Sequence, residues 1–310
     1  MLSSRMRIWK GFWQLADPKI WIASTIPMLV SAAISYNTTG TFNFYWFFWT
    51  VLGIYLIEIG KNAINEFVDY NSGVDQYVEK EERTPFSGGK KTIVDGRLSV
   101  FEVKIISVIS LLAAVLIGLY IVIVRETGVF WLGLIGFALA ISYSLPPFKL
   151  AYRGLGEITV GLTFGPLIMI GTYLVQTNTL TNHVILISLP FALLITNILW
   201  INQYPDYNAD KKGNKMNWVV RLGRKKAVFV YEFLFLSSYI SIIVLFVYFK
   251  NPLWLLPFIS LPLVIEAIKT ARKYYDNIPK LLSANAKSIQ IYQLFGLTLF
   301  LAAILDSVFF

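Results

Sequence analysis

Long apolar stretches dominate this chain and are separated by short polar segments. Nine such stretches can be marked, at about 18–36, 42–66, 101–123, 127–146, 155–176, 183–204, 227–249, 252–269 and 287–307. Most of them approach the roughly 20 residues that a helix needs to cross a bilayer. Because lipid offers no partners to free backbone groups, each stretch is expected to be a helix. The pattern predicts an all-α membrane protein with nine transmembrane helices.

Composition agrees with this class of protein. The 310 residues are 56% hydrophobic and only 15% charged, whereas a soluble domain carries about 25% charged residues. The absence of cysteine excludes disulfides, thiolate metal sites and cysteine nucleophiles. The first apolar stretch has no small-residue cleavage site and is too long for a signal peptide, so residues 1–310 are expected to form a single integral membrane domain.

The distribution of positive charge predicts the orientation in the membrane. The net charge is +9, and the basic residues lie in short loops, where they meet lipid headgroups or phosphate rather than nucleic acid. Of the 27 Lys and Arg residues, only Arg125 and Lys250 fall on the side opposite the N-terminus. The positive-inside rule then places the N-terminus and the basic loops in the cytoplasm of a multi-pass cell-membrane protein, with Phe310 outside.

A first acidic cluster follows the second apolar stretch, near residues 62–75. Asn65 and Asp69 are four residues apart, which puts their oxygens on one face of a helix. Asn71-Ser-Gly is a helix stop, so Asp75 is expected to return toward Asp69 from a turn. Such hard oxygen ligands suit a divalent cation such as Mg²⁺.

A second acidic cluster follows the sixth apolar stretch, near residues 202–210. Asn202, Asp206 and Asp210 keep a strict four-residue step, and Pro205 is expected to kink the helix where these ligands converge. Two helix ends with similar chemistry suggest a pseudo-repeat, and such repeats place a shared site between their halves. The sequence therefore predicts a cation and phosphate site at the membrane interface.

A simpler interpretation of the first cluster is that its acids cap a helix and pair with Lys80 and Arg83, as in many solvated loops. The presence of a second, similar cluster favours the metal site.

Basic residues near the two clusters are candidates for binding a diphosphate. Pro146-Pro147 breaks the fourth stretch, and Lys149 and Arg153 follow at the cytoplasmic edge. Both can equally act as anchors for lipid headgroups. The loop 83–91 offers Arg83, Lys90 and Lys91, although its Gly-Gly is not a nucleotide-binding loop.

With these motifs the chain resembles the UbiA superfamily of intramembrane aromatic prenyltransferases, over nearly its whole length. That family has nine helices around a central cavity open to lipid, and an Asp-rich motif after the second and the sixth helix. The step from Asp69 to Asp75 and the stretches 152–157 and 220–223 are most similar to the branch that prenylates 1,4-dihydroxy-2-naphthoate for menaquinone. Glu66 stands where many members have Asp, and Asn217-Trp218 replaces the usual Thr-Leu.

The resemblance implies transfer of a polyprenyl group from its diphosphate to an aromatic acceptor, with two Mg²⁺ ions that Mn²⁺ can replace. It implies metal binding by Asn65, Asp69, Asp75, Asp206 and Asp210. Catalysis would also involve Asn202, Lys149 and Tyr143, the last through its aromatic face. Substrate contacts would come from Arg83, Lys90, Lys91 and Arg153.

Other functions remain open at this point. The alternative acceptors are 4-hydroxybenzoate, a homogentisate-like ring and a glycerol-phosphate lipid. A secondary transporter also carries acids in its spans, and here Glu232 and Glu266 are the candidates. A phosphatidyl-alcohol transferase is disfavoured because its longer Asp-Gly and Ala-Arg signature is missing.

Overall fold

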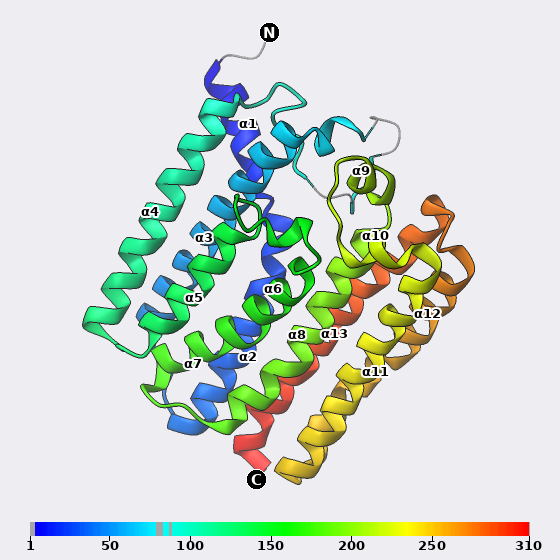
Figure 1. Cartoon of the computed structure of the whole chain (residues 1–310). Helices are drawn as coiled ribbons and strands as arrows, with labels where there is room; N and C mark the ends of the chain where they lie inside the picture. The colour runs from blue at the N-terminus through cyan, green and yellow to red at the C-terminus, as the bar shows by residue number, and fades with distance from the viewer. Residues whose placement is uncertain (1–3, 79–82, 87–88, 310) are drawn as a thin grey trace.

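The apolar stretches fold into long helices that run side by side (Figure 1). The computed structural model describes residues 4–78, 83–86 and 89–309, and every regular element among them is helical. Within this described part, eight helices are long and apolar enough to cross a bilayer. The ninth expected span corresponds to α5 (Val129–Ser142), whose 14 residues fall short of that length. The all-α membrane architecture is confirmed, whereas the count of nine spans is not.

The described part of the chain contains thirteen α-helices and several shorter helical segments. The helices not yet given are α1 (Ser4–Ala16), α2 (Ile22–Thr39), α3 (Phe44–Ser72), α4 (Val100–Val124), α6 (Gly156–Leu162), α7 (Ile168–Thr177), α8 (Asn182–Asn202), α9 (Tyr207–Lys212), α10 (Trp218–Leu222), α11 (Arg224–Phe249), α12 (Leu261–Tyr274) and α13 (Ile278–Phe309). The shorter segments include η2 (Val74–Gln76), η4 (Leu150–Tyr152), the π-helical η5 (Thr163–Leu167) and η6 (Pro252–Ser260).

Local chemistry explains where the helices begin and end. Ser99 accepts the backbone N–H of Glu102, whose carboxylate accepts the N–H of Ser99, and this capping box starts α4. The Asn43 side chain caps the start of α3 by accepting the N–H of Trp46. At its other end, α3 stops at Gly73, whose φ of 83° is a left-handed conformation that glycine adopts without strain.

The packed core and the outer surface are both apolar, as expected for a protein surrounded by lipid. α13 packs against α2, α8 and α12, and α8 packs against α11. Phe191 lies at the centre of this cluster, with ring contacts to Tyr292 at 5.9 Å and Phe295 at 6.1 Å. Large apolar side chains also point outward along single helices, such as Leu116 on α4 and Phe229 on α11. The chain is a multi-pass membrane protein.

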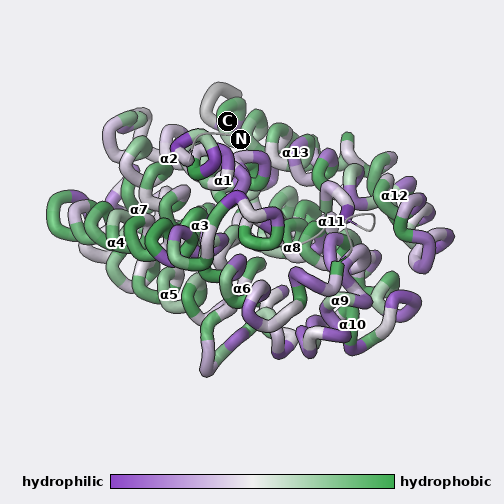
Figure 2. Tube along the Cα trace, turned by 90° about the horizontal axis from the view of Figure 1, so that it is seen from above, coloured by the Kyte–Doolittle hydropathy of each residue, from purple (hydrophilic) through white to green (hydrophobic). Residues whose placement is uncertain are grey.

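Polar segments gather at one end of the helix bundle. The loops after α3 and α8 lie at the end where α1 begins, and α13 ends at the opposite end (Figure 1). Figure 2 looks down on the former end and shows hydrophilic segments around α9 and α10. Both Asp-rich segments therefore belong to the same end of the molecule.

Candidate active site

Helix α3 positions the first acidic cluster. Asn65 and Asp69 lie one turn apart in its last turns, and the Asp69 side chain is almost fully buried. The helix ends at Gly73, as Asn71-Ser-Gly predicts, and Asp75 follows in η2, also buried. The Nδ2 of Asn65 donates to the Ser144 hydroxyl at 3.3 Å, so this amide contacts the segment after α5.

Asp69 has two strong hydrogen-bond donors from distant parts of the chain. The Tyr152 hydroxyl donates to its Oδ1 at 2.6 Å. The ammonium of Lys215 donates to its Oδ2 at 2.9 Å. Charge-assisted bonds of this kind stabilise the ionised carboxylate.

The second acidic cluster does not lie on one continuous helix. α8 ends at Asn202, the chain turns through Pro205, and α9 starts after Asp206. The kink expected at Pro205 is therefore a full break between α8 and α9, because Pro205 has no N–H to continue the helix. The Oδ1 of Asn202 accepts from Asn285 of α13 at 2.9 Å, which ties this amide to the core.

Lys215 joins the two clusters. The Oδ2 of Asp210 accepts from the Asn217 amide at 2.8 Å, and its Oδ1 lies 3.9 Å from the Lys215 ammonium. The same ammonium contacts Asp69, so one lysine lies between the α3 and the α9 carboxylates. It also faces the ring of Tyr152, 5.6 Å from the ring centre.

These carboxylates are buried and repel one another, so a nearby positive charge is needed to stabilise their ionised form. Burial, together with Asp206 and Asp69, raises the pKa of Asp210 to about 7. Burial, together with Asp69, likewise raises the pKa of Asp75 to about 7. Burial disfavours the charge of Lys215, but Asp69 and Asp210 more than offset this and hold its pKa well above the usual value.

The donors fit a hard cation, although they are not assembled around one. Within residues 4–78, 83–86 and 89–309, no group of three or more His, Cys, Asp or Glu is placed to hold a metal. The available oxygens are carboxylates and amides, which are the ligands that Mg²⁺ takes. Lys215 lies between Asp69 and Asp210 and places a positive charge there, as such an ion would.

The loop after η2 brings one predicted basic residue into the site. The Lys91 ammonium is 2.7 Å from Asp75 Oδ1, and both side chains are nearly buried. Gly89 allows this close packing, since it has a φ of 75° and a Cβ there would lie 2.2 Å from the same oxygen. Glu66 fixes the loop by accepting hydrogen bonds from the N–H groups of residues 90, 91 and 93 and from the Thr92 hydroxyl.

The other two basic residues predicted in this loop have partners elsewhere. Lys90 pairs with Asp17 at 2.6 Å, and Arg83 pairs with Asp95 at 2.7 Å. The alternative that Arg83 pairs with the first acidic cluster therefore receives no support, and Lys80 lies outside the described residues.

The residues predicted after α5 lie at different depths. The Lys149 ammonium faces the Tyr152 ring, 4.8 Å from its centre, and so lies beside the tyrosine that binds Asp69. Arg153 is exposed and donates to the carbonyl of Pro147 at 2.7 Å. Tyr143 is half-buried and lines a cavity.

The sequence interpretation missed three residues that organise the site. Tyr152 and Lys215 contact Asp69 directly, and the Lys215 contact joins residues 146 positions apart. Glu157 accepts from the Gln203 amide at 2.9 Å and from the Trp218 N–H at 3.0 Å, which holds the second cluster against α6. The only available signal was the stretch 152–157, which carries both Tyr152 and Glu157.

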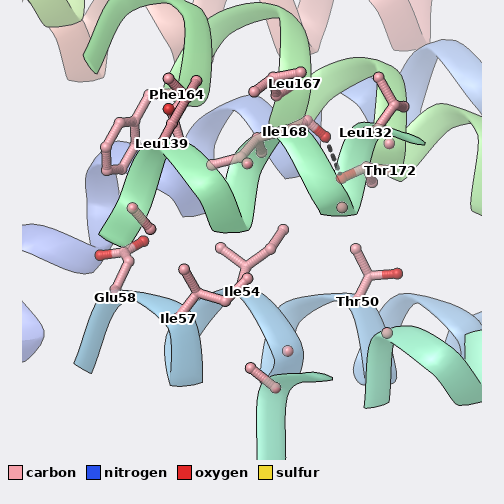
Figure 3. Close-up of a pocket in the computed structure, with 18 of the residues that line it drawn as sticks. Thr50, Ile54, Ile57, Glu58, Leu132, Leu139, Phe164, Leu167, Ile168 and Thr172 are labelled. Atoms are coloured by element: carbon pink, nitrogen blue, oxygen red, sulfur yellow. Dashed lines mark hydrogen bonds between the residues drawn. The ribbon is translucent and has the colours of Figure 1, made fainter. Parts of the chain in front are cut away.

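An apolar cavity lies among the membrane helices, and its polar end is formed by residues of α3 that precede the acidic cluster. It lies between α3 and the helices α4, α5, α6 and α7, and its empty volume is about 1100 Å³ when the part open to the outside is included. Ile54, Ile57, Leu139 and Phe164 project into it, and Thr50 and Glu58 mark its two ends in Figure 3. Glu58, Lys61 and Tyr143 make the end nearer Asn65 polar.

The fold and its acidic end define an intramembrane protein with a charged site next to an apolar cavity. A family model described as the UbiA prenyltransferase family matches residues 24–300, so the chain belongs to this family. It is a prenyltransferase, and the family predicted from the motifs is confirmed.

Two curated relatives also confirm the resemblance to the naphthoate branch. The chain is 27% identical over 258 residues to the 1,4-dihydroxy-2-naphthoate octaprenyltransferase of Bacillus subtilis, covering 83% of this chain and 80% of that protein. It is 28% identical over 263 residues to the 2-carboxy-1,4-naphthoquinone phytyltransferase of Synechocystis sp., covering 84% and 81%.

A solved structure of a UbiA homologue from Archaeoglobus fulgidus, bound to GPP and Mg²⁺, has the same fold. Its TM-score is 0.65 at 17% identity, covering 94% of this chain and 99% of that one. Identity this low supports the fold alone.

Proposed function

We propose that this protein transfers a polyprenyl group from polyprenyl diphosphate to 1,4-dihydroxy-2-naphthoate, in a reaction that depends on Mg²⁺. The observation that carries the proposal is the pairing of a charged site with an apolar cavity along one helix, α3. A prenyl diphosphate has the same two parts, a charged head and a hydrocarbon chain. The acceptor is inferred from the naphthoate prenyltransferases that the chain resembles.

The diphosphate is proposed to lie between the α3 and α9 carboxylates. Asn65, Asp69, Asp75, Asp206 and Asp210 would hold Mg²⁺, which neutralises the charge that develops on the leaving diphosphate. Lys215 lies between two of these carboxylates, where its ammonium would add positive charge for the diphosphate. Tyr152 keeps Asp69 oriented by its 2.6 Å hydrogen bond.

The prenyl chain is proposed to occupy the cavity between α3 and α7. Breaking the bond between carbon one and the diphosphate leaves an allylic cation. The Tyr143 ring, at the polar end of the cavity, can stabilise such a cation by about 0.5–2 kcal/mol. The apolar walls exclude water, which would otherwise capture the cation.

The acceptor ring then attacks carbon one and forms the new carbon–carbon bond. With a dihydroxynaphthoate acceptor, the bond forms at the ring carbon that carries the carboxylate, and the carboxylate leaves as carbon dioxide, whose bonding electrons return to the ring and restore its aromaticity. Neither step requires histidine or cysteine, and the only histidine, His183, lies at the start of α8, beside Phe249.

The two acids that the transporter alternative named have partners on neighbouring helices. Glu232 pairs with Arg272, and Glu266 pairs with Lys287 at 2.8 Å. Both acids are thus used in ion pairs between neighbouring helices rather than aimed at a central pathway.

Identification of the lipid product tests the proposed function. Membranes containing the protein would be incubated with labelled prenyl diphosphates of several lengths, Mg²⁺ and equal concentrations of 1,4-dihydroxy-2-naphthoate and 4-hydroxybenzoate. A prenylated naphthoquinol is expected as the main lipid product. A clear preference for 4-hydroxybenzoate would contradict the acceptor and leave prenyl transfer standing, whereas no prenylated product from any aromatic acid would contradict the reaction.

A further inference from the structure

One buried carboxylate next to the proposed site has no role in the reaction described so far. Glu58 of α3 is only 4% exposed and lines the cavity. Neither of its carboxylate oxygens has a hydrogen bond within the described part of the chain. The facing Ser24 hydroxyl donates instead to the carbonyl of Trp21 at 3.0 Å. A buried carboxylate without donors is costly, so its presence requires an explanation.

The position of Glu58 connects the cavity to the diphosphate site. Glu58, Lys61, Asn65 and Asp69 follow one another at steps of three or four residues, which places them along one face of α3. With a rise of about 1.5 Å per residue, Glu58 lies roughly 10 Å along the helix axis from Asn65. Figure 3 shows its carboxylate directed into the space beneath Leu139 and Phe164. If the diphosphate lies near Asn65, this separation leaves room for an aromatic ring between the Glu58 carboxylate and carbon one of the prenyl chain.

The chemistry of the two substrates decides which of them Glu58 can bind. The prenyl chain has no hydrogen-bond donor, and the diphosphate is an anion that a carboxylate repels. Only the aromatic acceptor carries hydroxyl groups that can donate to Glu58. Lys61, also lining this end of the cavity, can attract the carboxylate of the same acceptor.

We propose that Glu58 is the acceptor-positioning residue, and that its carboxylate accepts a hydrogen bond from a ring hydroxyl of the aromatic substrate. This inference rests on the proposed function for the identity of that substrate. Removing either the ring hydroxyl or the carboxylate removes a hydrogen bond to a buried charge. This should weaken binding of the acceptor by about tenfold or more.

The test combines a variant with a matched ligand. The variants are Glu58→Leu, which removes the acceptor atoms, and Glu58→Gln, which keeps one of them. The ligands are 1,4-dihydroxy-2-naphthoate and its 1,4-dimethoxy analogue, which cannot donate. Glu266→Gln is the control, because the Glu266 side chain is 59% exposed and pairs with Lys287.

Glu58→Leu is expected to raise the KM for the dihydroxy acceptor about tenfold or more, with Glu58→Gln in between. The KM for prenyl diphosphate should stay within about twofold. In the wild type the dimethoxy analogue should bind about tenfold more weakly than the dihydroxy acid, and in Glu58→Leu the two should bind equally. Unfolding temperature should not fall in Glu58→Leu, because the lost carboxylate has no hydrogen bond within the described part of the chain.

Two results would overturn the proposal. One is an acceptor KM that is unchanged in a folded Glu58→Leu variant. The other is a preference for hydroxyl over methoxy groups that survives the substitution. Equilibrium titration of both acids, without prenyl diphosphate, separates this proposal from the proposed function. If no turnover occurs but Glu58→Leu still abolishes the hydroxyl preference, the binding site stands and the reaction does not.

Discussion

The two acidic clusters differ in how their charge is neutralised. In the first, Lys215 contacts Asp69 at 2.9 Å and Lys91 contacts Asp75 at 2.7 Å. In the second, Asp210 accepts from the amide of Asn217, and its ion-pair contact among the described residues is at 3.9 Å. An amide supplies hydrogen bonds but no charge, so Asp210 has a weaker contact with positive charge than Asp69 or Asp75. The difference suggests that an entering cation would bridge Asp69 and the second cluster.

The strongest test of this comparison is removal of the metal. Since both clusters would bind through carboxylates and amides, excess EDTA is expected to lower prenyl transfer by roughly a hundredfold or more, and added Mg²⁺ should restore it. Product formation in washed membranes measures this. Undiminished turnover in EDTA would mean that Lys215 and Lys91 suffice and that no metal takes part.

Removing one carboxylate charge from either acidic cluster should have the next largest effect on turnover. Asp69→Asn and Asp206→Asn are each expected to lower kcat by about a hundredfold, because each loses a charge that would bind metal. Both proteins should remain inserted in the membrane. Asp276→Asn is the matched control, since the Asp276 side chain is 74% exposed and pairs with Arg224. Near-normal rates in both site variants would reduce the clusters to helix caps and loop contacts.

The lysine that joins the clusters should matter for stability when metal is absent. Lys215→Met leaves Asp69 buried without its ammonium partner, which is expected to lower the free energy of unfolding by about 3 kcal/mol in EDTA. Saturating Mg²⁺ should recover part of this loss. Lys212→Met is the control, because the Lys212 side chain is exposed and its ammonium faces the ring of Tyr77, 4.3 Å from the ring centre. Equal losses with and without Mg²⁺ would show that metal and lysine do not act at the same place.

Substitution of Asp75, which pairs with Lys91 at the edge of the first cluster, should have the smallest effect on turnover. Asp75 already has Lys91 as a dedicated partner, so Asp75→Asn is expected to lower kcat about tenfold, less than Asp69→Asn. Kinetics with both variants under identical Mg²⁺ concentrations measure the ranking. A loss as large as that of Asp69→Asn would place Asp75 among the central ligands and remove the asymmetry between the clusters.

The sequence predicted the helices better than the site. Apolar runs determine helices in a membrane because the backbone has no other partner there, and Asn71-Ser-Gly marked the end of α3 correctly. The break between Asn202 and Asp206 was predicted only as a kink, since a four-residue step does not reveal that the helix has ended.

Contacts between distant segments account for what the sequence did not show. Lys215 was one of many basic loop residues, and only the fold brings it to Asp69. Glu58 drew no attention because its proposed role depends on a carboxylate left without hydrogen bonds by the described residues, which only three-dimensional packing can reveal. Lys90 and Arg83 were expected at the diphosphate, yet each pairs with an aspartate outside the clusters.

The most direct test of the central claim measures binding rather than turnover. Purified protein would be titrated with a prenyl diphosphate with and without Mg²⁺, in the wild type and in Asp69→Asn and Asp206→Asn. If one metal–diphosphate site spans both clusters, tight binding requires Mg²⁺, and either substitution weakens it by a similar factor of about ten or more. Binding that is equally tight in EDTA, or that depends on one cluster only, would contradict the account.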